Sequence, residues 1–173
     1  MRNLLIVCAF LMISCKSNYT VSQYIQQEVE TCPENGVCSI ELFPNKAIVF
    51  KTDNIGIMYP EISEGSKTIL KYTYTKNTIK NIQDSSYTEI IYAEFDADIT
   101  PMELSDETLQ NVKLYFGRLC YCKGETGYFP VKNGELKLTK INKNSFKLDL
   151  NFSISEVPQI ISKISETISL KSN

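Results

Sequence analysis

The segment "RLCYCKG" (residues 118–124) places two thiols, Cys120 and Cys122, one residue apart. Arg118 and Lys123 flank them, and nearby cations favour the thiolate that attacks disulfides. This pattern supports a hypothesis of thiol–disulfide exchange. Thioredoxin-like enzymes, however, use two intervening residues in an α/β setting, and the residues here match neither feature. We therefore favour a structural role for this pair.

A second cysteine pair, Cys32 and Cys38, flanks the turn residues "PENG". Four cysteines permit three disulfide connectivities. Strand alternation would place Cys120 and Cys122 on one face, with their Cα atoms near the upper limit for a bridge, roughly 6.8 Å. We therefore expect each cysteine of the turn to pair with one of the strand cysteines. The alternative joins Cys32 to Cys38 and leaves the other two as a dithiol or a local bridge.

Acidic residues offer a further type of chemistry. Glu94, Asp96 and Asp98 follow one another at two-residue steps, and their oxygens suit Ca²⁺. A solvated outer face of a strand explains the same pattern more simply. We therefore expect no metal ligands among them.

Several classes of function are excluded by composition. The 173 residues include no histidine, which removes Ser-His-Asp triads, Cys-His dyads and histidine-bearing catalytic zinc sites. Seven glycines form no phosphate loop or dinucleotide fingerprint. The formal charge of −2, without a dense cluster of Lys or Arg, argues against a nucleic-acid partner. We expect no catalytic residues and no cofactor, and hence a protein that is not an enzyme.

The N-terminus has the pattern of an export signal. Arg2 precedes a short apolar run from Leu4 to Ile13, which is too short to span a bilayer, and Cys15 follows Ser14. The stretch "LMISC" resembles the lipobox of bacterial lipoproteins, with Met12 where Leu is usual. The resemblance implies that residues 1–14 are a signal peptide and that Cys15 becomes lipidated. The alternative is ordinary secretion with removal of the signal.

Behind the lipidated cysteine, residues 15–30 are polar and are expected to form a tether that includes a short helix. Residues 31–173 are expected to form a single β-rich domain. In "SFKLDLNFSIS", apolar residues alternate with polar ones, which predicts a strand over 145–154. Further strands are expected at 46–51, 68–76, 87–99, 128–132 and 135–141, and the turns at Asn133-Gly134 and "INKNS" predict a three-stranded meander over 128–154.

Helices are expected to be minor. Ser105 is a suitable N-cap for a short helix at 105–114, and Ile160, Ile161, Ile164 and Ile168 share one helical face, which predicts a terminal helix at 157–169. The expected architecture is therefore an antiparallel β sandwich or calycin-like barrel with these two helices.

Together these features predict a binding or structural module at the cell envelope. A lipid anchor would hold it to a membrane, in a periplasmic or surface-facing position, and its ligand would be an unidentified small molecule or protein. A periplasmic thiol–disulfide protein that uses Cys120 and Cys122 is the alternative.

Overall fold

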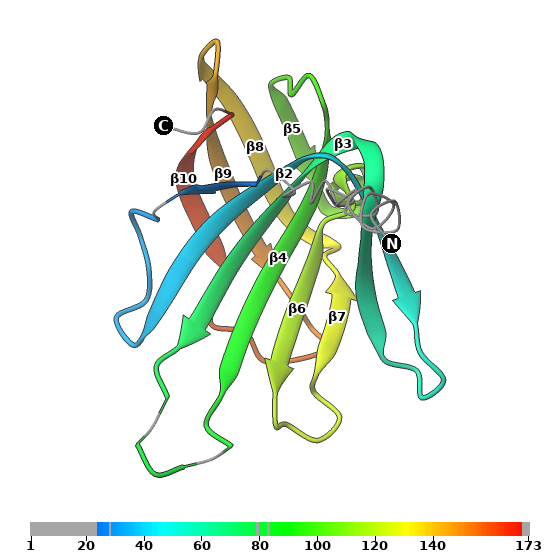
Figure 1. Ribbon diagram of the computed structural model, residues 1–173, viewed down its shortest axis with the longest axis vertical. Coiled ribbons are helices and arrows are strands. Elements are labelled where there is room, and N and C mark those ends of the chain that lie inside the picture. The colour runs from blue at the N-terminus through cyan, green and yellow to red at the C-terminus, as the bar shows by residue number, and fades with distance from the viewer. Residues whose placement is uncertain (1–23, 28, 79, 83, 171–173) are drawn as a thin grey trace, which may run out of the picture.

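The computed structural model describes residues 24–170 apart from 28, 79 and 83, and this part of the chain forms two antiparallel sheets (Figure 1). The six-stranded sheet has the order β1 (Ile25–Gln27), β2 (Gly36–Thr52), β3 (Met58–Lys76), β4 (Tyr87–Asp96), β6 (Tyr115–Cys120), β7 (Gly127–Pro130). The four-stranded sheet has the order β10 (Lys163–Ser169), β9 (Ser145–Ser153), β8 (Asn133–Asn142), β5 (Met102–Ser105). The prediction of an all-β domain is confirmed. The two sheets form a sandwich, and their hydrogen bonds do not close the described strands into one barrel.

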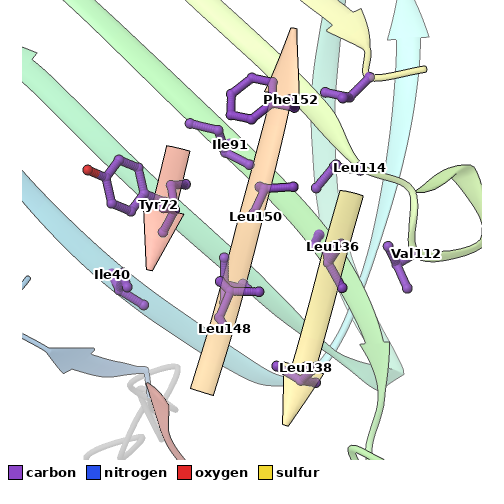
Figure 2. Packing of buried hydrophobic residues seen from close by; sticks show 14 of the residues in the cluster. Ile40, Tyr72, Ile91, Val112, Leu114, Leu136, Leu138, Leu148, Leu150 and Phe152 are labelled. Carbon is purple, nitrogen blue, oxygen red and sulfur yellow. The ribbon is translucent and has the colours of Figure 1, made fainter. Parts of the chain in front are cut away.

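The inner faces of both sheets build one hydrophobic core. Figure 2 shows Ile40 and Tyr72 of the larger sheet facing Leu148 and Leu150 of the smaller one. Each large apolar side chain buried in this way stabilises the fold by about 1.5–3 kcal/mol. The predicted alternation in β9 is confirmed, because its buried residues are Phe146, Leu148, Leu150 and Phe152.

The hairpin of β2 and β3 continues beyond the main sheet and folds back over its outer face. A register shift between Pro44 and Lys46 marks the bend, where Asn45 has a φ of 57°. Asn tolerates this left-handed conformation better than most residues. We call the returning part, residues 46–64, the arm.

The arm covers a second, smaller core on the outer face. Phe50 of the arm stacks on Tyr115, with ring centroids 3.6 Å apart, and also contacts Tyr92 and Tyr128. The buried members of this core are Ile48, Ile69, Ile90 and Tyr92. The outer face of β4 is therefore covered at Ile90 and Tyr92, whereas Asp96 at the end of the strand is exposed, as alternation suggested.

One edge of the sandwich is joined by side chains that reach from one sheet to the other. The side-chain amide of Gln27 in β1 donates to the carbonyl of Ser169 in β10 at 2.6 Å and accepts from the Ser169 N–H at 3.0 Å. These two bonds resemble one rung of a β ladder. They link the first strand of the larger sheet to the edge strand of the smaller one.

The predicted C-terminal helix at 157–169 is wrong, because Lys163–Ser169 form strand β10. Ile164 and Ile168 are four residues apart, a spacing that fits one helical face and one strand face equally well. The residue between them on the strand face, Glu166, is buried and polar, so it concealed the period of two.

Other expectations need smaller corrections. The meander is wrong in part, since β7 pairs with β6 in the larger sheet while β8 and β9 belong to the smaller one. The expected helix at 105–114 is a 3₁₀ helix, η2 (Asp106–Val112), preceded by Ser105. The expected tether of residues 15–30 contains strand β1, because Ile25 pairs with Leu42 of β2.

Candidate functional site: the loop end of the sandwich

Both disulfides lie at one end of the sandwich, which is the lower end in Figure 1. We call this the loop end and define it by the connections 33–36, 53–57, 77–86, 121–126 and 154–162. Cys32 is bonded to Cys38 across the first connection, and Cys120 to Cys122 at the start of the fourth. The expected pairing between the two segments is therefore wrong, and the alternative pairing of Cys32 with Cys38 is the one that forms.

Sheet topology explains the pairing. Strands β3 and β4 lie between β2 and β6, so Cys38 and Cys120 are three strand spacings apart, about 14 Å. Two cysteines with Cα atoms more than about 7 Å apart cannot be bridged. Strand β6 also ends at Cys120, and the chain then bends, which brings the Cα atoms of Cys120 and Cys122 to 5.2 Å.

A polar row crosses the inner face of the larger sheet at this end. In register, Cys38 pairs with Tyr74, Tyr74 with Glu89, and Glu89 with Arg118. The next inward row, which includes Ile40, is apolar. The polar row therefore marks the boundary between the core and the loops.

Glu89 is fully buried and anchors the connection between β9 and β10. Its carboxylate accepts main-chain N–H bonds from Ile160 at 2.6 Å and Ile161 at 2.7 Å, as well as the hydroxyl of Tyr87. Buried charges are tolerated when hydrogen bonds satisfy them in this way. Glu89 therefore fixes the position of residues 154–162.

Arg118 fixes the β6–β7 connection. Its Nη1 donates to the carboxylate of Glu125 at 2.8 Å and to the Glu125 carbonyl at 3.0 Å, and its guanidinium lies 5.3 Å from the ring centre of Tyr87. Burial, reinforced by the hydrogen bond to Glu89, raises the pKa of Tyr87 to about 12. The phenol is therefore neutral at physiological pH and donates to Glu89.

An open groove of about 590 Å³ runs beside the first disulfide, between residues 30–33 and the start of β10. Glu30 and Thr31, which line it, donate their N–H groups to the buried carboxylate of Glu166, and the Thr31 hydroxyl donates to it at 2.8 Å. The hydroxyl of Tyr72, another lining residue, donates to the Cys38 sulfur at 3.0 Å. The groove has space for a small ligand, but its polar groups already bind one another.

The loop end exposes large apolar side chains on four of its connections and at the adjoining ends of β2 and β6. Ile55 is 80% exposed, Tyr121 76% and Val37 66%. The others at this end are Ile82, Leu119 and Ile160. Such a group on tethered loops is typical of a contact surface rather than of a catalytic pocket.

The acidic residues considered for Ca²⁺ are held apart by other partners. Glu94 accepts the Ile48 N–H at 2.8 Å and pairs with Lys113 at 2.7 Å. Asp96 pairs with Lys67, and Asp98 lies beyond the end of β4. Within the described ranges, no group of three or more His, Cys, Asp or Glu side chains is arranged to hold a metal ion.

Residues 1–14 and Cys15 lie outside the described part of the chain, so the predicted signal peptide and lipidation site have no structural description. In the part that is described, no helix is both long and apolar enough to cross a membrane. Comparisons with protein-family models, curated proteins and solved structures give no match to this chain.

Sequence reasoning missed the two buried carboxylates. Glu89 lies two residues before Ile91 and shares its inward face, and Glu166 lies between Ile164 and Ile168. An acidic residue at an inward position of an alternating strand is the signal that would have revealed each one.

Proposed function

We propose that this chain is a lipid-anchored binding module of the cell envelope, without catalytic activity, that contacts its partner through the loop end. The observation that carries the proposal is a set of exposed apolar side chains, of which Val37, Tyr121 and Ile160 lie in segments held by the two disulfides, Glu89 and Arg118. Ile55 and Ile82 lie on other connections at the same end. Preorganised loops lose little conformational entropy when they bind. The lipobox-like sequence before Cys15 supports the anchor.

The direction of β1 supports the same arrangement. Strand β1 runs from the level of Leu42 to the level of Ile40, and β2 begins at the loop end, so β1 runs toward the loops. The described chain therefore begins, at Tyr24, on the side of β1 that is farther from the loops. Anchoring through Cys15 would leave the loop end directed away from the membrane.

Site-specific photo-crosslinking in intact envelopes tests the binding surface. A photoreactive residue at Tyr121 or Ile55 is expected to form adducts with a defined partner, and Ile82→Ser is expected to weaken them. The matched control is Thr139, an exposed position on β8. Equal adducts at Thr139, or none at the loop positions, would contradict the proposed surface.

Thiol–disulfide exchange is a second candidate function, favoured by the half-buried position of the Cys120–Cys122 bridge on either side of exposed Tyr121. A thiolate of an external dithiol would attack one of the two sulfurs and release the other as a thiolate. The second thiol of the reagent would then resolve the mixed disulfide, leaving the reagent oxidised and both cysteines reduced. Catalysed reduction of a disulfide substrate, lost in Cys120→Ser and retained in Cys32→Ser, would favour this function over the first.

A further inference from the structure

The turn between β8 and β9 has features that the proposed binding surface does not use. It lies at the end of the sandwich opposite the loop end, at the top of Figure 1. In the β8–β9 ladder, Lys140 pairs with Phe146 and Asn142 with Ser145, so Ile141 is an extra, bulged residue. A bulge redirects a side chain out of the regular pleat. Ile141 is accordingly 54% exposed at the tip of the hairpin.

Basic side chains flank this isoleucine. Lys140 and Lys143 are both exposed, and within the described residues neither belongs to an ion pair. Two other lysines at this end, Lys46 and Lys67, are paired with Glu64 and Asp96. The hairpin tip therefore carries uncompensated positive charge next to an exposed apolar side chain.

Strand β1 lies near this tip, because Gln27 binds Ser169 and Ser169 pairs with Ser145 beside the turn. Eight residues lie between Cys15 and the first described residue, Tyr24, and a chain of this length reaches about 30 Å at most. If Cys15 carries lipid, the tip is held within a short distance of the bilayer. A short tether between two binding groups raises the effective concentration of the second group at the membrane. A group with low affinity of its own can therefore still bind.

We infer that residues 140–143 form a second membrane contact, in which Lys140 and Lys143 bind anionic lipid headgroups and Ile141 enters the interface. Lysines near an anionic leaflet and an apolar side chain beside them are the combination that binds a lipid surface. The exposed Asp98, also at this end, opposes the attraction in part. The contact orients the sandwich with its loop end away from the membrane. This inference rests on the proposed anchor at Cys15.

A single tryptophan tests the contact, because the chain contains no Trp. Ile141→Trp places the probe at the tip, and Ile55→Trp, at another exposed isoleucine, is the matched control at the loop end. The full lipidated chain is incorporated into vesicles of phosphatidylethanolamine and phosphatidylglycerol, some with brominated acyl chains. We expect a blue-shifted, bromine-quenched emission from the probe at 141 and a water-exposed emission from the probe at 55.

Charge reversal at the two lysines provides a second test of the contact. In the Ile141→Trp background, Lys140→Glu with Lys143→Glu is expected to abolish the blue shift, and vesicles of phosphatidylcholine alone are expected to reduce it. If the chain floats with the vesicles but the probe at 141 remains in water, or the probe at 55 is the one quenched, the second contact is wrong while the anchor stands. If the chain does not float at all, the anchor fails and the second contact falls with it.

Discussion

The carboxylate of Glu89 accepts the main-chain N–H of Ile161, at 2.7 Å, although the two residues are 72 positions apart in the chain. Glu89 belongs to the larger sheet, while Ile161 lies just before the edge strand of the smaller one. The bond therefore joins the two layers at the loop end. It also satisfies an N–H that would otherwise be buried without a partner.

We expect Glu89→Ala to destabilise the domain by about 3–5 kcal/mol, because two main-chain N–H groups and the Tyr87 hydroxyl lose their acceptor. Urea unfolding measures the loss, and hydrogen exchange should show faster exchange at Ile160 and Ile161. Glu34→Ala, at an exposed turn position, is the control and should change stability by less than about 0.5 kcal/mol. Similar stability of the two variants would show that the loop does not depend on Glu89.

The disulfide pairing makes a prediction about fragments. A protease site inserted into the 77–86 connection should yield two pieces that separate under denaturing conditions without reductant, because both bridges are local, with sequence separations of 6 and 2. Pieces that stay joined until reductant is added would instead indicate bridges between the two segments. Loss of the Cys32–Cys38 bridge should cost about 2 kcal/mol, the chain-entropy value for so short a loop.

Tyrosine ionisation makes a prediction about alkaline pH. The pKa of Tyr87 is raised to about 12, and burial also raises the pKa of Tyr72 and of Tyr92. Folding thus favours the neutral phenols, so their contribution to stability is complete below about pH 10, the usual pKa, and is lost as pH rises through the folded pKa values. Stability should therefore decline above pH 10.

Absorbance of tyrosinate, followed in native and in urea-unfolded protein, measures this effect. Part of the signal of the ten tyrosines should appear at higher pH in the native protein than in the unfolded one. Tyr87→Phe should remove one of the late-titrating groups. A native titration that coincides with the unfolded one, in a protein that remains folded, would contradict the burial of these phenols.

Local alternation was sufficient to predict most of the β structure. The apolar residues of β9 face the core as expected, because one side of that strand is buried and the other is not. Alternation could not predict the arm, because the sequence of β4 does not show that a distant hairpin covers Ile90 and Tyr92. In β10, the buried residue Glu166 led to the wrong prediction of a helix, because a strand is recognised by apolar residues at its inward positions and Glu166 is polar.

The candidate site was less predictable than the fold. The cysteines were identified from sequence, but their pairing depends on the two strands that separate β2 from β6, and strand order is a property of the whole sheet. The exposed apolar residues at the loop end belong to four connections and to the adjoining ends of β2 and β6, which are distant in sequence. They come together only through the topology of the sandwich.

Lipid attachment at Cys15 is the central claim, and metabolic labelling with a radioactive palmitate tests it most directly. The wild-type chain should be labelled, whereas Cys15→Ala should carry no label although Cys32, Cys38, Cys120 and Cys122 are all retained. Equal labelling of the two chains, or labelling of neither, would contradict the account and leave ordinary secretion in its place.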